Sequence, residues 1–135
     1  MKQIDSSINF KINNKIGKKV IINFDNEQFN RLFFNLIKNS IESIQEKVKK
    51  TNKSLKNIDI EINQRRDYIT VNLNDTGEGF KDKKTKDIIK PYYTTKEKGT
   101  GLGLSIVDKI INDHNGSIKF FNTKNGAKVQ IVIPK

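Results

Sequence analysis

Two asparagines, Asn35 and Asn39, stand four residues apart inside an apolar run that repeats at three- and four-residue spacing. On a helix this spacing places both amides on one face, so their carbonyl oxygens can converge on a metal ion or a ligand. The neighbours Leu36 and Ile37 put the pair near the buried side of the helix, where an amide without a partner is costly. Chance explains the pair about equally well, because the chain is rich in asparagine.

A second pattern is the acid and two alternating glycines Asp75, Gly77 and Gly79, which follow a strand-like segment. The glycines let the backbone approach a ligand closely. A carboxylate at the end of a strand can accept a hydrogen bond from an exocyclic amine such as adenine N6. An ordinary turn is the plainer interpretation of this pattern taken alone.

A third pattern is the run of alternating glycines at 99–103, which opens a second apolar periodic segment. Exposed amides and the dipole at the start of a helix favour a phosphate. The run is neither a Walker loop nor a Rossmann fingerprint, because Leu104 stands where a further glycine or a Gly-Lys pair would be needed. A flexible hinge before a helix is the alternative.

Taken together, the three patterns predict an ATP site. The first offers metal ligands, the second an acceptor for adenine and the third a cradle for phosphates. The lysine-rich segment 81–98 lies between the last two patterns, and we expect it to close over the nucleotide as a lid.

The elements expected around these patterns form one α/β sandwich, with helices on one face of a mostly antiparallel sheet. A long amphipathic helix is predicted from the cap at Asp25 to about Val48, and a second from the 99–103 run to Asn115-Gly116. The first two strands are expected to pair as a hairpin through the turn at 13–17. Alternating apolar residues predict strands at 8–13, 19–24, 57–63, 68–74, 117–121 and 127–133.

The chain of 135 residues has the length of one domain. Its composition excludes several chemistries, because it has no cysteine and a single histidine, His114. The net charge of +11 arises mostly from lysine, since only three of the 26 basic residues are arginine. Together with one alanine and abundant Asn and Ile, this bias is typical of an AT-rich genome, so no dedicated nucleic-acid surface is expected. With no membrane-spanning stretch and no signal peptide, we expect a cytoplasmic domain.

In order and spacing, the three patterns resemble the motifs of GHKL (Bergerat-fold) ATP-binding domains, in particular the catalytic domains of sensor histidine kinases. Residues 35–39 are similar to their N box, 75–79 to their G1 box, 81–98 to their lid and 99–107 to their G2 box. The stretch 91–116 is closest to the nitrogen-regulation (NtrY-like) branch. The resemblance spans residues 8–134. It implies one ATP-binding domain over 1–135, an α/β (α+β) sandwich with about three helices on one face of a mixed, mostly antiparallel sheet.

The resemblance also implies a role for each matching residue. Asn39 would coordinate Mg²⁺ through its amide oxygen, and Asn35 would help at the same face. Asp75 would bind adenine N6, with the purine lying close to Gly77 and Gly79. The phosphates would be bound at Gly99, Thr100, Gly101, Leu102 and Gly103, and Lys96 or Lys38 would neutralise their charge. Many histidine kinases carry Lys-Tyr where Glu42 and Ser43 stand here.

The position one turn before Asn39 separates the relatives. GHKL ATPases carry a glutamate there as the general base that activates water, and anti-sigma serine kinases also carry one. Asn35 cannot accept a proton, so the chain should hydrolyse ATP poorly and hold it for transfer to an outside acceptor. A histidine kinase is therefore favoured, and a GHKL serine kinase or ATPase fragment is the alternative. A basic nucleic-acid module is more remote, because Phe33 and Phe34 are expected in the core.

A histidine kinase also needs an acceptor histidine on a helical dimerisation domain, and this chain has no such segment. His114 is expected in the last turn of the second helix, where an imidazole interacts favourably with the helix dipole. The chain is therefore expected to be the catalytic domain of a longer sensor, cytoplasmic even if that sensor is membrane-anchored, and monomeric when isolated. Its expected partners are the dimerisation (histidine-phosphotransfer) domain of the same kinase and the receiver domain of a response regulator.

Overall fold

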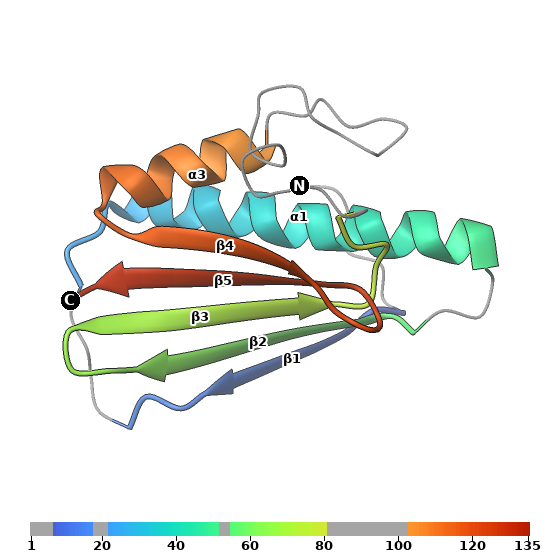
Figure 1. Ribbon diagram of the computed structural model, residues 1–135, viewed down its shortest axis with the longest axis horizontal. Coiled ribbons are helices and arrows are strands. Elements are labelled where there is room, and N and C mark those ends of the chain that lie inside the picture. Colours follow the sequence, from blue (N-terminus) through green and yellow to red (C-terminus); the bar gives the residue numbers. More distant parts are fainter. Residues whose placement is uncertain (1–6, 18–21, 52–54, 81–102) are drawn as a thin grey trace.

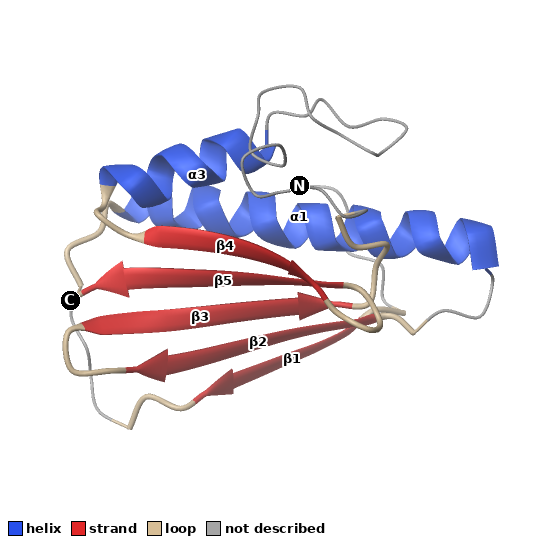
Figure 2. Cartoon of the chain, viewed as in Figure 1, coloured by secondary structure: helices blue, strands red, loops and turns tan. Residues whose placement is uncertain are grey.

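The computed structural model describes residues 7–17, 22–51, 55–80 and 103–135. Within them, two helices cover one face of a five-stranded sheet (Figure 1, Figure 2). The helices are α1 (Asn26–Thr51) and α3 (Gly103–Asp113). The strands are β1 (Asn9–Asn14), β2 (Asn57–Gln64), β3 (Tyr68–Asp75), β4 (Ser117–Asn122) and β5 (Ala127–Pro134).

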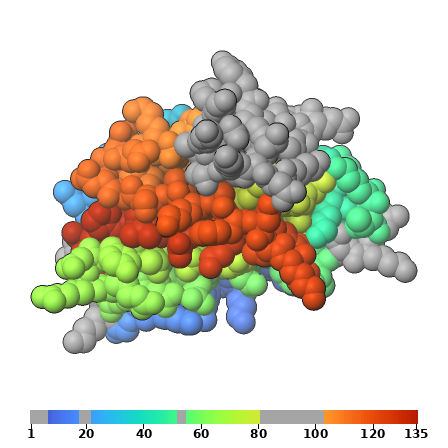
Figure 3. Space-filling view, viewed as in Figure 1, coloured from blue at the N-terminus to red at the C-terminus, as the bar shows by residue number. Residues whose placement is uncertain are grey.

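The sheet is mixed, in the order β1-β2-β3-β5-β4. β1 runs parallel to β2, and all other neighbours are antiparallel. The strands occupy the middle and lower part of Figure 3, with β4 and β5 in orange and red and β1 in blue at the lower rim. The predicted two-layer sandwich is therefore confirmed, and two of the roughly three expected helices lie within the described residues. Neither of them has the length and hydropathy that a membrane crossing needs.

Alternation along the strands decides which face of the sheet is buried. On β3 every second residue is apolar and less than a tenth exposed, and each of these residues pairs with a buried residue of β5. A slip of one residue in this register would turn the whole apolar set to the solvent, so the pairing is strongly specified. The buried pairs are Ile69–Ile133, Val71–Ile131 and Leu73–Val129.

Helix α1 begins where the sequence predicts and ends three residues later than expected, at Thr51. The Asp25 carboxylate accepts a hydrogen bond from the Gln28 backbone N–H at 3.0 Å, which satisfies one of the free donors of the first turn. One expectation about this helix is wrong: Phe34 is 43% exposed. It lies two residues after the fully buried Leu32, and two residues turn the side chain about 200° around the helix axis.

The end of α3 is fixed by residues that the sequence marks as a cap. Asn115 has φ 62°, and the Gly116 N–H donates to the Ile111 carbonyl oxygen at 2.9 Å, which closes the last turn. A side chain at Gly116 would place its Cβ 2.5 Å from the Val132 carbonyl oxygen, so only glycine fits there. The predicted C-terminal signal is confirmed.

His114 joins this end of α3 to the start of α1. Its ring stacks on Phe24 with 3.6 Å between centroids and an angle of 6°. Nδ1 lies 2.7 Å from the Ile110 carbonyl oxygen, and Nε2 accepts a hydrogen bond from the Asp25 N–H at 3.2 Å. A tautomer with its proton on Nδ1 satisfies both contacts. Both ring nitrogens of His114 are thus used in holding the two helix ends together.

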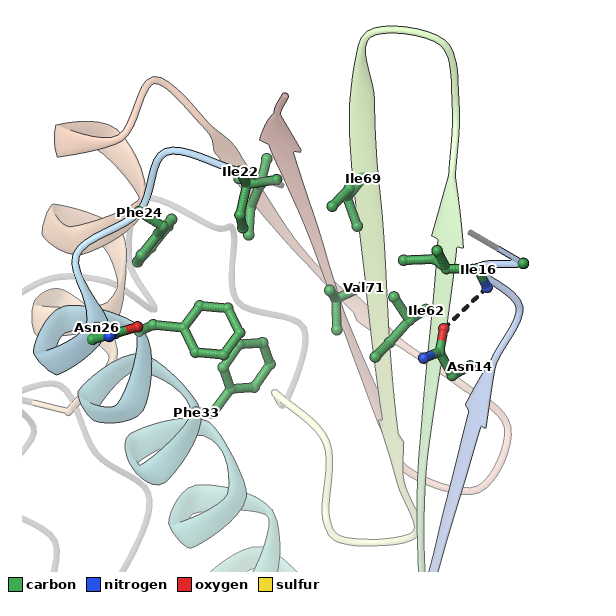
Figure 4. A pocket seen from close by; sticks show the side chains of 12 residues that line it. Asn14, Ile16, Ile22, Phe24, Asn26, Phe33, Ile62, Ile69 and Val71 are labelled. Carbon is green, nitrogen blue, oxygen red and sulfur yellow. Dashed lines mark hydrogen bonds between the residues drawn. The ribbon is translucent and has the colours of Figure 1, made fainter. Parts of the chain in front are cut away.

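The predicted hairpin of the first two strands is wrong. β1 pairs with β2, from Asn9 opposite Asn57 to Asn14 opposite Ile62, and residues 22–24 belong to no strand. Residues 18–21 of the predicted partner lie outside the described residues. Ile22 and Phe24 instead line an apolar cavity of about 660 Å³ between the start of α1 and the sheet (Figure 4). The alternating pattern predicts that apolar side chains share one face. In the structure Phe24 is covered by ring contacts with Phe29 and His114, and it does not belong to a strand.

Replacing His114 with alanine is expected to lower the free energy of unfolding by about 1–2 kcal/mol. The change removes the acceptor of the Asp25 N–H, the partner of the Ile110 carbonyl and the stacked ring. Urea denaturation followed by circular dichroism measures it. Lys109→Ala is the control, because the Lys109–Asp113 pair is exposed, and it should change stability by less than about 0.5 kcal/mol. Equal midpoints for the two variants would contradict the role of His114.

Candidate functional site

The predicted N box and the start of the G2 helix are in contact. A Cβ added to Gly103 at the start of α3 would lie 3.4 Å from Asn39 Nδ2, 3.6 Å from Asn39 Oδ1 and 3.8 Å from Asn35 Oδ1. Asn35 Nδ2 donates to the Arg31 carbonyl oxygen at 2.9 Å, which fixes the rotation of this amide. The Asn39 amide nitrogen is buried. The two amides therefore converge on one place, as their spacing predicts, and that place is the N-terminus of α3.

The predicted adenine acceptor, Asp75, is buried at the end of β3 and is held at both carboxylate oxygens. The Ser40 hydroxyl of α1 donates to Oδ2 at 2.9 Å, and the Gly77 N–H donates to Oδ1 at 2.9 Å. Ser40 and Asp75 are the only buried polar side chains in the described part of the chain, at 3% and 8% exposure. These two hydrogen bonds orient the carboxylate at the end of the strand.

Both glycines of the predicted G1 box are required by packing. A Cβ on Gly77 would lie 2.6 Å from the Ser43 Cβ of α1, and a Cβ on Gly79 would lie 2.7 Å from Asn122 Oδ1. Gly79 also has φ 78°, a conformation that side chains disfavour. The loop after β3 thus runs in close contact with α1 on one side and with the end of β4 on the other. The sequence indicated glycines here for a turn or for the close approach of a ligand. The structure shows a further requirement, the close packing against Ser43 and Asn122.

Sequence reasoning missed three side chains that hold this loop. Ser40 lies at a buried position of the apolar stripe of α1, and a hydroxyl at such a position is the signal that could have found it. The Ser43 hydroxyl accepts a hydrogen bond from the Glu78 N–H at 2.8 Å. Lys50 forms an ion pair with Glu78 at 2.6 Å, and this carboxylate raises the pKa of Lys50 through the hydrogen bond and its charge. The last two contacts join residues distant in sequence, so no local signal predicts them.

The described residues around the start of α3 offer groups that could hold a phosphate and an oxygen-liganded metal ion. No group of three or more His, Cys, Asp or Glu that could hold a metal lies within the described ranges. Amide oxygens meet the N-terminus of α3, whose first turn has no acidic residue. Mg²⁺ prefers oxygen ligands and commonly takes most of them from water and phosphates, and a helix N-terminus attracts phosphate. The cavity of Figure 4 is formed by none of the predicted site residues.

Part of the predicted site lies outside the described residues. This applies to the lid at 81–98 and to the following predicted ligands of the phosphates: Lys96, Gly99, Thr100, Gly101 and Leu102. Lys38, the other candidate for a phosphate contact, is exposed on α1.

Residues 24–135 match the sequence model of a family described as histidine kinase-, DNA gyrase B- and HSP90-like ATPases. Sporulation kinase C of Bacillus subtilis is 36% identical over 115 residues, which are 84% of this chain and 25% of that protein. Nitrogen regulation protein NtrY of Azorhizobium caulinodans is 33% identical over 103 residues, 76% of this chain and 13% of that protein. The chain thus spans a quarter or less of the length of these two relatives.

Among solved structures, the catalytic domain of histidine kinase ThkA superposes with a TM-score of 0.77 at 29% identity. The superposition covers 96% of this chain and 81% of that domain. A mycobacterial sensor histidine kinase, MprB, has the same TM-score at 18% identity, and this likeness concerns the fold alone. These matches confirm the predicted architecture.

Gly77→Ala is expected to lower the free energy of unfolding by about 2 kcal/mol, because the added methyl group collides with Ser43. Ser43→Gly alone should cost about 1–2 kcal/mol, because it places a glycine within a helix and removes the acceptor of the Glu78 N–H. The double variant should be more stable than the sum of the two effects predicts, by at least about 0.5 kcal/mol. Urea denaturation of all four proteins measures this coupling, and strict additivity would contradict the close contact.

Proposed function

Because the chain belongs to the family of histidine kinase-, DNA gyrase B- and HSP90-like ATPases, we propose that it is the ATP-binding catalytic domain of a protein histidine kinase. It binds Mg²⁺·ATP and supplies the γ-phosphate to a histidine on a separate dimerisation domain. The observation that carries this proposal is the Asp75 carboxylate, buried and held by Ser40 one residue after Asn39. The side chain that holds the adenine acceptor and the amide for the phosphate end thus come from adjacent residues of one helix, Ser40 and Asn39.

In this proposal Asp75 accepts a hydrogen bond from the exocyclic amine of adenine, and the packed loop with Gly77 and Gly79 leaves the purine close to the backbone. A guanine presents a carbonyl oxygen at the same position, and two acceptors facing each other repel, so adenine is selected. Ser40 and the Gly77 N–H keep the carboxylate oriented.

At the phosphate end, Asn39 would hold Mg²⁺ through its amide oxygen, with Asn35 beside it. When bound, the ion neutralises negative charge on the phosphates during transfer. The N–H groups at the start of α3 attract the phosphates, and the proposal assigns further contacts to Gly99, Thr100, Gly101, Leu102, Gly103 and Lys96. These residues position the γ-phosphate, which is the main contribution of protein to phosphoryl transfer.

Transfer is favoured over hydrolysis because the Asn35 side chain cannot act as a general base that activates water. Its Nδ2 donates to the Arg31 carbonyl, and its Oδ1 is a neutral amide oxygen that cannot take a proton. In the proposed reaction the bond from γ-phosphorus to the β,γ-bridging oxygen breaks and ADP leaves. The unprotonated imidazole nitrogen of the acceptor forms a bond to the γ-phosphorus with its lone pair, and the proton on the other ring nitrogen passes to solvent.

We also propose that residues 1–135 form a single cytoplasmic domain, monomeric in isolation, whose acceptor histidine belongs to another domain of a longer kinase. The phosphoryl group then passes to an aspartate on the receiver domain of a response regulator. The sporulation kinases and NtrY-like proteins among the relatives support this arrangement.

Calorimetric titration with a non-hydrolysable ATP analogue tests the binding site. Wild-type protein with Mg²⁺ should bind at micromolar to sub-millimolar concentration, and Asp75→Asn should weaken binding at least about tenfold, because the amide turns a donor toward the adenine amine. Asp59→Asn, an exposed carboxyl on β2, is the control and should bind like wild type. Absence of binding by the wild-type protein would overturn the proposed function.

Asn35→Glu tests the preference for transfer. A carboxylate at this position can accept a proton from water, so release of phosphate from ATP should rise by about ten- to a hundredfold. Asn35→Gln, which adds the same methylene group without a base, should not change the slow basal rate. A rate for Asn35→Glu no higher than that for Asn35→Gln would show that the amide at 35 does not limit hydrolysis.

A further inference from the structure

Helix α1 carries a stripe of polar side chains that point at the loops beyond the ends of β3 and β4. Its members stand at intervals of three and four residues, so they share one face of the helix. Each makes a hydrogen bond or ion pair to the end of β3 or to a loop residue, as follows: Ser40 to Asp75, Ser43 to Glu78, Lys47 to the Asn125 carbonyl oxygen, and Lys50 to Glu78. We call this set the loop-facing stripe. It runs along α1 on the C-terminal side of Asn39.

Glu78 is held twice by this stripe. Its backbone N–H donates to the Ser43 hydroxyl at 2.8 Å, and its carboxylate accepts from Lys50 at 2.6 Å. The Glu78 side chain is only 12% exposed although it is charged, so the Lys50 ammonium replaces much of its lost hydration. Glu78 stands between Gly77 and Gly79, and fixing it therefore fixes the backbone on both sides.

The opposite side of the loop is held by the β4–β5 connection. Asn122 Oδ1 accepts a hydrogen bond from the Phe80 N–H at 2.6 Å. A Cβ on Gly126 would lie 2.9 Å from the Asp75 carbonyl carbon, so this turn packs directly on the strand end. With α1 on one side and this turn on the other, residues 75–80 are held in position by contacts within this chain.

We propose that Ser43, Lys50 and Glu78 are positioning residues for adenine recognition, an inference that rests on the proposed function. They touch no reacting group, and act by holding the loop so that Asp75 and the two glycines keep their binding geometry. When the loop is already ordered, binding does not include the free-energy cost of ordering it, so the affinity for the ligand is higher. The effect belongs to the adenine end of the nucleotide, so it is the same for ligands with different numbers of phosphates.

Calorimetric titration with the ATP analogue and with ADP tests this inference. Lys50→Met and Glu78→Gln should each raise both dissociation constants by about three- to tenfold, and by equal factors for the two ligands. Lys50→Arg keeps the charge and should stay within about twofold of wild type. Lys49→Met is the matched control, because Lys49 is the neighbouring lysine and pairs with Glu46 on the same helix.

The outcomes separate this inference from the proposed function. No binding by the wild-type protein overturns both. Wild-type affinity in Lys50→Met, or equal weakening in Lys50→Arg and Lys50→Met, overturns the positioning role alone. A loss much larger for the ATP analogue than for ADP would mean that Lys50 contacts phosphate, which also overturns it.

A second measurement needs no ligand. Amide hydrogen exchange at Gly77, Glu78 and Phe80 should become at least about tenfold faster in Lys50→Met and in Ser43→Ala, while exchange in β3 stays unchanged. Faster exchange throughout the protein would indicate general destabilisation, and unchanged exchange at the loop would show that the stripe does not hold it. Either result overturns the proposal.

Discussion

The arrangement of the candidate site depends on the buried hydrogen bond between the Ser40 hydroxyl and the Asp75 carboxylate. A carboxylate that is only 8% exposed is costly unless its oxygens are hydrogen-bonded, and Ser40 together with the Gly77 N–H supplies these bonds. Because Ser40 belongs to α1 and Asp75 ends β3, this single contact fixes how the helix is rotated against the sheet. The alternative rotations would leave a buried charge without its donor.

Once the rotation of α1 is fixed, the positions of its neighbouring side chains follow. Asn39 precedes Ser40 and is turned about 100° around the axis, which directs its amide to the start of α3 beside Gly103. One turn further on, Ser43 reaches the loop after β3. The groups that would contact the two ends of a bound nucleotide are therefore both positioned by side chains of one helix.

The same helix also supplies much of the core, so stability and binding are not separable along α1. Leu32, Leu36 and Ile44 are at most 2% exposed, and Ser40 continues their stripe with a polar group. The apolar contacts hold the helix on the sheet, and the hydroxyl sets its angle. The catalytic domain of histidine kinase ThkA has a similar architecture over 96% of this chain.

The sequence by itself determined the features that depend on near neighbours. These are the five alternating strands of the sheet, the Asp25 cap, the Asn115-Gly116 stop and the four-residue spacing of Asn35 and Asn39. It placed the acid and glycines of the loop after β3 correctly at the end of a strand. Each of these features is decided by backbone geometry and by solvent exposure within a few residues, which a pattern of residue types records.

Only the tertiary structure decided which elements are partners. Alternation identified β1 as a strand without indicating that it pairs in parallel with β2, 48 residues away at Asn9 and Asn57. It could not show that the Gly77 and Gly79 loop packs against Ser43 and Asn122, or that Lys50 reaches Glu78. These contacts join residues that lie far apart along the chain, and their energies depend on the distance and burial that folding creates. A periodic pattern carries no information on either quantity.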